Sequence, residues 1–128
     1  MADVWTELDE VIASLSSVSD IQAVAIVRRD GLVITHNLPS AVEPKIVAAM
    51  TAAIVGTSEM ATVQLGQGRF MQALIDGEHG KLVSTGAGDE ALLVALAYRD
   101  ANLGLILMAL ERAAHRIDQI LSRTEPAR

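Results

Sequence analysis

The chain has 128 residues, a formal net charge of −6, 51% hydrophobic and 2% aromatic residues, and no cysteine. This length predicts a single domain, and this hydrophobic fraction excludes a disordered chain. The acidic balance argues against nucleic acid as a partner, and the missing cysteines exclude disulfides, thiolate catalysis and cysteine-ligated zinc.

The N-terminal segment predicts an amphipathic helix. Apolar residues recur at helical spacing from Val4 to Leu15, with the acidic residues mostly on the other side. Asp3 is placed to cap the first turn, and Ser16–Asp20 ends the helix. Because the segment has neither a basic region nor a long apolar core, we expect no signal peptide and a cytoplasmic location.

Two short strands follow. Ile21–Val27 is apolar except for Gln22 and rich in β-branched residues, and Leu32–His36 is the second run. Asp30 and Gly31 lie between them, and an Asp-Gly pair between two such runs is typical of a β-hairpin.

The second helix is expected to begin at Pro44 and to end at about Ala61. Its stretch Ile46–Ser58 carries no charged residue, whereas a surface helix normally has a charged face. A second protein chain is therefore expected to cover one side; the alternative is an alanine-rich face partly exposed to water. No apolar run reaches the roughly 20 residues of a membrane helix, so no membrane insertion is expected.

The two sides of this helix are assigned by residue size, at about 100° per residue. The large residues Ile46, Val47, Met50 and Ile54 are expected to face the sheet. The small residues on the other side would let a partner backbone approach closely. These predicted dimer-interface residues are Ala48, Ala52, Val55 and Gly56.

Three further strands are predicted, at Arg69–Ile75, Lys81–Thr85 and Ala91–Ala97. By periodicity alone Ala91–Ala97 could equally be buried helix, but it is short and lies between turn signals, which favours a strand. Asp100 or Asn102 can cap a last helix with an apolar stripe from Leu103 to Leu121. Residues 124–128 are expected to be a frayed tail.

The predicted fold class is α+β, an α/β sandwich in the order α-β-β-α-β-β-β-α, with one domain over residues 1–128 and its core at about 4–122. Hairpins join consecutive strands, so the sheet should be mainly antiparallel. Ile21–Val27 and Ala91–Ala97 should be central because they are apolar on both faces. The apolar edge strand Phe70–Ile75 should invite another chain to pair with it, which adds Phe70, Gln72 and Leu74 to the predicted dimer interface.

The chain resembles the Roadblock/dynein light chain family over about residues 4–122. The resemblance rests on turns and apolar runs: the strand before Arg29–Gly31, the Ala-rich helix begun by Pro44, the Gly66/Gly68 turn, the hairpin ending at Gly86–Gly88, and Asp100–Gly104. It implies a five-stranded antiparallel sheet with one helix on one face and two on the other. It also implies homodimers or heterodimers with paired uncharged helices and joined sheets, and a role in regulating or scaffolding small Ras-like GTPases or as a dynein light chain.

Catalytic and cofactor motifs are weak. Gly86–Ala91 fits the G-x-G-x-x-A form of a dinucleotide fingerprint, but Asp89 and Glu90 would repel a pyrophosphate, so a hairpin turn is favoured. The three histidines lie in separate segments without metal-site spacing. We therefore expect no catalytic residue, no cofactor and no metal.

Four arginines are candidate contacts for a GTPase. Arg28 and Arg29 lie at the tip of the first hairpin, and Arg112 and Arg116 form an i, i+4 pair on the last helix. A loop arginine can stabilise phosphoryl transfer when it is supplied to a GTPase in trans. Turn arginines are commonly only solubilising, and an exposed helix face explains Arg112 and Arg116 equally well.

The favoured function is a non-catalytic dimeric adaptor or regulator that binds a small Ras-like GTPase, as the resemblance implies. The first alternative is a GTPase-activating protein that accelerates hydrolysis by its partner. The second is a small-molecule sensor of profilin-like or PAS-like type, against which the scarcity of aromatic residues counts.

Overall fold

A computed structural model of the chain describes residues 3–123. The predicted order of helices and strands is confirmed, while the predicted tail at 124–128 lies outside the described residues. The elements are α1 (Val4–Ser16), β1 (Ile21–Arg28), β2 (Val33–His36), α2 (Pro44–Gln64), β3 (Ala73–Asp76), β4 (Gly80–Ala87), β5 (Ala91–Tyr98) and α3 (Leu103–Ser122).

The five strands form one antiparallel sheet in the order β2-β1-β5-β4-β3. The apolar strands β1 and β5 pair along nearly their whole length, and β5 is the middle strand. Both lie inside the sheet, as their apolar sequences predicted, because a strand buried on both faces needs no polar alternation. β2 and β3 form the two edges.

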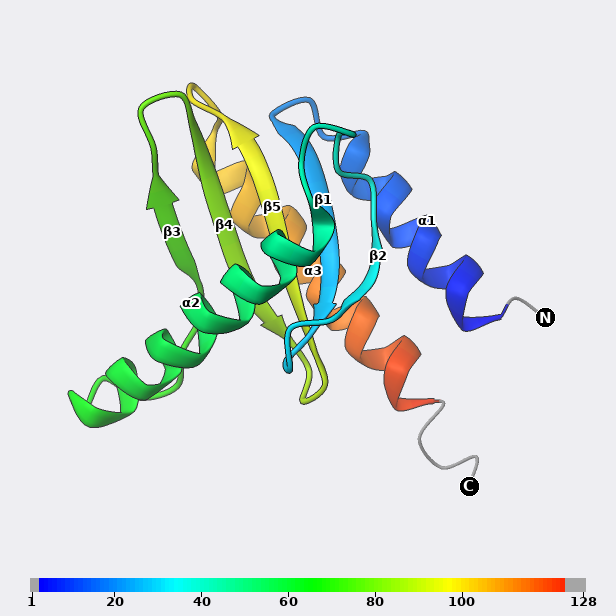
Figure 1. The fold of residues 1–128 in the computed structure, drawn as a ribbon. Coiled ribbons are helices and arrows are strands. Elements are labelled where there is room, and N and C mark those ends of the chain that lie inside the picture. The colour runs from blue at the N-terminus through cyan, green and yellow to red at the C-terminus, as the bar shows by residue number, and fades with distance from the viewer. Residues whose placement is uncertain (1–2, 124–128) are drawn as a thin grey trace.

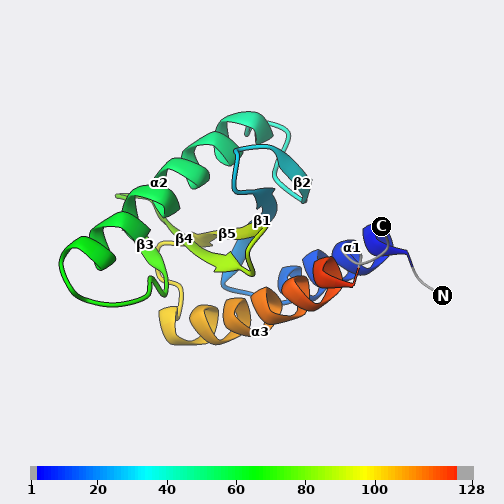
Figure 2. The same cartoon turned by 90° about the horizontal axis from the view of Figure 1, so that it is seen from below.

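The helices make two layers around the sheet. Figures 1 and 2 show α2 crossing one face, and α1 with α3 on the other. Val24 and Ile26 of β1 belong to the core under α1 and α3, whereas Ala23 and Ala25 belong to the core under α2. The sheet surface beneath α2 therefore carries small side chains on β1, so the helix can approach that strand closely.

The first turns of the three helices start at the capping residues or the proline that the sequence predicted. Thr6 donates its backbone N–H to Oδ1 of Asp3 at 2.8 Å. Asn102 rather than Asp100 caps α3, because its Oδ1 accepts the N–H of Leu105 at 3.1 Å. Pro44 begins α2, at a position where a missing N–H costs no helical hydrogen bond.

The cap at Asp3 predicts a pH-dependent contribution to stability. The hydrogen bond from Thr6 lowers the pKa of Asp3, so the cap favours the folded state most at pH values above the ordinary aspartate pKa. Replacing Asp3 with Ala should lower the melting temperature at pH 7. The difference from wild type should shrink as the pH falls below about 4, where the carboxyl becomes protonated.

Thermal melts by circular dichroism between about pH 2.5 and 7 measure this difference. Asp3→Asn is the control, because an amide oxygen keeps the cap but does not titrate. A gap between wild type and Asp3→Ala that is the same at pH 3 and pH 7 would contradict the assignment.

Several predicted boundaries differ from those of the structure, and two of them by three residues or more. The strand expected at Arg69–Ile75 begins only at Ala73, and α2 continues three residues past Ala61 to Gln64. Before Ala73 the backbone leaves the ladder: the Thr85 hydroxyl donates to the carbonyl of Met71 at 2.9 Å, and Phe70 packs against the core under α2. Tertiary contacts therefore replace strand pairing over residues 69–72.

Candidate interaction surfaces

The side of α2 that faces away from the sheet is apolar and exposed. Ile46 is 56% exposed, Met50 47% and Met60 67%. Contiguous exposed apolar surface of this kind marks a protein or membrane contact, because leaving it in water is unfavourable. We name as the α2 outer stripe the outward-facing residues Ile46, Ala49, Met50, Ala53, Thr57 and Met60.

The last turns of α2 project past β3 instead of lying on the sheet (Figures 1 and 2). Val63 there is 67% exposed, and Leu65 just beyond the helix is 71% exposed. Among the described residues, α2 is long and apolar enough to cross a membrane. The sequence-based expectation missed this because it counted only the uninterrupted uncharged stretch.

The predicted orientation of α2 is wrong in part. Val47, assigned to the sheet, is buried there as predicted, and Ile54 is half-buried. Ala48 and Val55, assigned to a partner, are buried against the sheet of their own chain, and Ala52 is half-buried. Ile46 and Met50, assigned to the sheet, are exposed. The alanines of β1 leave room for Ala48 and Val55, and Ile46 and Met50 lie on the outer side of the helix. Of the four predicted helix residues, only Gly56 is exposed.

The edge strand β3 is short and partly apolar. Leu74 and Ile75 are 45% and 46% exposed, and they point to opposite faces of the sheet, because neighbouring strand residues alternate. Gln72 is exposed and Phe70 half-buried, and both precede the strand. The edge that could pair with another chain is therefore Ala73–Asp76, shorter than predicted.

Arg29 holds three elements together. Its Nη1 lies 3.0 Å from Oε2 of Glu59 on α2, and its Nη2 donates to the carbonyl of Gly88 in the β4–β5 turn at 3.1 Å. A Cβ added to Gly86 would lie 2.9 Å from the same Nη2, so a glycine there keeps the path of the guanidinium open. Arg29 is thus half-buried and held by two distant segments of its own chain, whereas Arg28 is exposed and pairs with its near neighbour Asp30 at 2.7 Å.

Replacing Arg28 and Arg29 one at a time should show that Arg29 stabilises the fold and Arg28 does not. Arg29→Met should lower the free energy of unfolding by about 1 kcal/mol, a value discounted because the ion pair is about one-third exposed. Arg28→Met should change it by less than about 0.5 kcal/mol. Urea unfolding of both variants measures the difference, and equal effects would contradict the assigned role of Arg29.

The other two candidate arginines lie at the junction of α1 and α3. Nη2 of Arg116 is 3.3 Å from Oε1 of Glu10 on α1. Arg112 is exposed and forms no ion pair with any carboxylate of residues 3–123. Arg112 and Arg116 therefore lie together on α3, on the face of the sheet opposite to α2, whereas Arg28 lies at the end of β1.

The dinucleotide interpretation of Gly86–Ala91 is wrong. β4 runs through Ala87, a turn follows with Gly88 at φ +80°, and β5 begins at Ala91, so no helix starts there.

The histidines make local contacts. His36 accepts the N–H of Leu38, and Nε2 of His79 lies beside Glu78. Within residues 3–123 no three His, Asp or Glu side chains gather in a way that could hold a metal.

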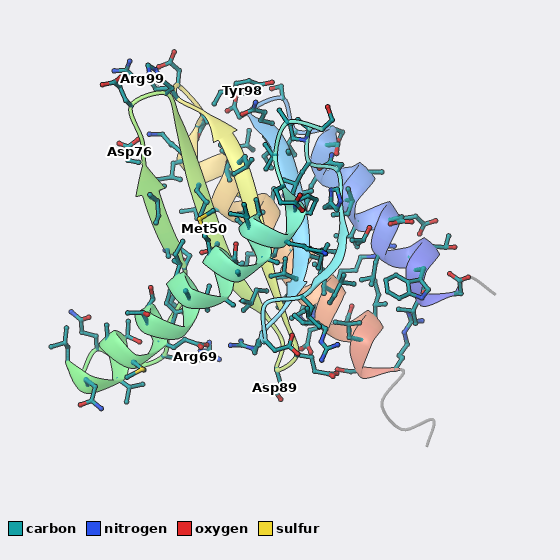
Figure 3. The ribbon with its side chains drawn as sticks, viewed as in Figure 1. Met50, Arg69, Asp76, Asp89, Tyr98 and Arg99 are labelled. Atoms are coloured by element: carbon teal, nitrogen blue, oxygen red, sulfur yellow. The ribbon has the colours of Figure 1, made fainter. Side chains whose placement is uncertain are left out.

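An open hollow of about 330 Å³ lies between α3 and the segment that precedes β3. Val83, Leu107 and Leu110 are among its apolar lining residues, and Arg69 and His115 are among its polar ones. In Figure 3, Arg69 and Asp89 lie at the same end of the sheet. A small molecule would bind here if the sensor alternative held.

Known proteins resemble this chain in sequence as well as in fold. The family model described as "Roadblock/LC7 domain" matches residues 7–97. A relative in Methanocaldococcus jannaschii, the uncharacterized protein MJ1340, is 39% identical over 110 residues, covering 86% of this chain and 96% of that protein.

Two solved structures share the fold. The gliding protein MglB from Thermus thermophilus superposes with a TM-score of 0.85 at 22% identity, covering 96% of this chain and 94% of that one. An MglB solved in a tetrameric arrangement gives a TM-score of 0.83, also at 22% identity, covering 96% and 93%. At these identities the likeness concerns the fold.

Proposed function

This chain belongs to the Roadblock/LC7 family, and on that premise we propose that it is a non-catalytic binding module that forms a dimer and regulates a small Ras-like GTPase in the cytoplasm. The observation that carries the proposal is the α2 outer stripe, an exposed apolar surface on a helix without a charged face. A surface of this kind serves binding rather than catalysis.

The dimer would use the α2 outer stripe and the β3 edge together. The C-terminal end of α2 projects past β3 (Figure 1), so that end of the stripe lies next to the β3 edge. A second copy related by a two-fold axis presents the same two surfaces, so stripe would meet stripe and edge would meet edge. The overhanging Met60, Val63 and Leu65 would then lie against the partner chain. The tetrameric MglB supports an assembling module at the level of the fold.

Regulation would follow from a difference in affinity. A binding module changes the behaviour of a GTPase only if it binds one nucleotide state more tightly than the other. Of the four candidate arginines, Arg28, Arg112 and Arg116 are exposed and can reach a partner. Arg29 is held by Glu59 and Gly88 and is withdrawn from this role.

Calorimetry against the Ras-like GTPases of the same cell, each loaded with GDP or with a non-hydrolysable GTP analogue, tests the proposal. Tighter binding to one state supports regulation. Equal binding to both states would contradict a regulatory role, and no binding would contradict a GTPase as the partner.

The alternative function is a GTPase-activating protein, favoured by the exposure of Arg28 on the first hairpin. An arginine supplied in trans can accelerate hydrolysis by several orders of magnitude. Measuring GTP hydrolysis with and without this chain, and with Arg28→Ala, separates an activator from a tether. A rate unchanged by the wild-type chain would exclude activation.

A further inference from the structure

The helices α1 and α3 lie side by side on the face opposite to α2 (Figure 2). Two ion pairs join them: Arg123 Nη2 is 2.6 Å from Glu7 Oε1, and Arg116 Nη2 is 3.3 Å from Glu10 Oε1. The pairs run in opposite order along the two helices, so the helices are antiparallel. Arg116 of α3 and Arg123, just past the end of α3, thus meet carboxylates of α1 along one seam.

The third position of this seam lacks its carboxylate. Arg112 lies one helical turn before Arg116, and the residue one turn after Glu10 on α1 is Ser14. Serine cannot neutralise a guanidinium, and Arg112 makes no ion pair within residues 3–123. Among residues 3–123, the seam therefore ends in an exposed arginine that pairs with no carboxylate.

A groove of about 270 Å³ opens at this position. Arg112 and Arg116 are the charged residues among its lining, although the chain as a whole carries a net charge of −6. Glu111, the neighbour of Arg112, lines the hollow on the other flank of α3. The apolar lining residues are Val11, Leu15, Val18, Ala109 and Ala113, and the small polar ones are Ser14 and Ser17.

We propose that this α1/α3 groove docks an acidic segment of another protein, with a carboxylate on Arg112 and an apolar side chain between the two helices. Arginine binds carboxylates through two parallel hydrogen bonds, which fixes the orientation of the segment as well as attracting it. The apolar floor supplies the burial that a charge pair on a surface lacks. The proposal goes beyond the regulatory function, because it requires neither a dimer nor a GTPase.

Ser14→Glu tests the groove by supplying the missing carboxylate from the chain itself. The new side chain should pair with Arg112 and close the site while the fold is retained, because Ser14 is exposed on a helix that accepts glutamate well. Gln67→Glu is the matched control: it adds the same charge at an exposed loop position after α2.

The probe is a display library of random peptides of about 12 residues, selected on the wild-type chain and counter-selected on Ser14→Glu. Selected peptides should be enriched in Asp or Glu next to an apolar residue. A synthetic copy of one should bind Ser14→Glu and Arg112→Glu about tenfold more weakly than wild type, with Gln67→Glu unchanged, as measured by fluorescence anisotropy. Its Glu-to-Lys counterpart should recover binding to Arg112→Glu.

Three results would overturn the proposal: no enrichment of acidic residues, equal binding to wild type and Ser14→Glu, or self-association of the wild-type chain that Ser14→Glu abolishes. The last would assign the groove to a second copy of this chain. Met50→Arg should leave peptide binding intact, since Met50 lies on the opposite face, so failure of the dimer and failure of the groove are distinguishable.

Discussion

Met50→Arg is expected to give a folded monomer. Met50 is 47% exposed in the single chain, so an arginine there can reach water and should leave the fold intact. In a dimer formed through the α2 outer stripe, the same arginine would be buried without a partner, which costs about 3–5 kcal/mol. The dimer dissociation constant should therefore rise by at least about a hundredfold.

Sedimentation velocity across micromolar concentrations measures the assembly, and circular dichroism checks the fold. Met108→Arg is the matched control, because Met108 is 59% exposed on α3, on the other face of the sheet. That variant should assemble like wild type. If Met50→Arg still forms the dimer, or if the wild-type chain is monomeric, the α2 outer stripe is not the interface.

A variant of the buried side of α2 gives the contrasting result. Ala48 is fully buried against the sheet, so Ala48→Arg should unfold the chain rather than divide a dimer. The two outcomes together identify the outer side of the helix independently of any partner.

Gly88→Ala is expected to be the most destabilising of the glycine-to-alanine changes, by about 2–4 kcal/mol. Gly88 adopts φ +80°, a conformation that costs an alanine roughly 1–2 kcal/mol. A Cβ at this position would also overlap the carboxylate of Asp118 on α3. The hydrogen bond from Arg29 to the Gly88 carbonyl also restrains the turn.

Gly68→Ala is the control for this prediction. Gly68 has a similar φ of +87°, but a Cβ there would meet no atom within 4 Å, so only the backbone strain remains. The double variant Gly88→Ala/Asp118→Ala should recover the part of the loss that is due to overlap. Urea unfolding measures all three, and a Gly88→Ala cost no larger than that of Gly68→Ala would exclude the steric contribution.

Much of the fold was predictable because its signals are local. The Asp-Gly turn, the capping Asp3 and the first-turn Pro44 each specify a chain reversal or a helix start within a few residues. The doubly apolar runs of β1 and β5 predicted central strands, since only a strand covered on both faces omits polar residues. Strand 69–75 was predicted too long because the contacts of Phe70 and Met71 come from α2 and β4.

The candidate surfaces were less predictable because their determinants are distant in sequence. Arg29 could be interpreted as a free loop arginine until its partners Glu59 and Gly88 were known, and these lie 30 and 59 residues away. That Arg112 pairs with no carboxylate of residues 3–123 likewise depends on α1, about a hundred residues earlier in the chain, where Ser14 stands at the matching position.

The amino-acid sequence alone predicted that α2 has more apolar surface than one sheet can cover, because its uncharged stretch Ile46–Ser58 has no side suited to water. It could not say which side faces out, since a helix that is apolar all round has no preferred direction. The tertiary structure decided this: Ala23 and Ala25 leave space on the sheet for Ala48 and Val55, and Ile46 and Met50 turn outward. The side of α2 that fits the shape of the sheet packs against it, even though it is not the side with the largest residues.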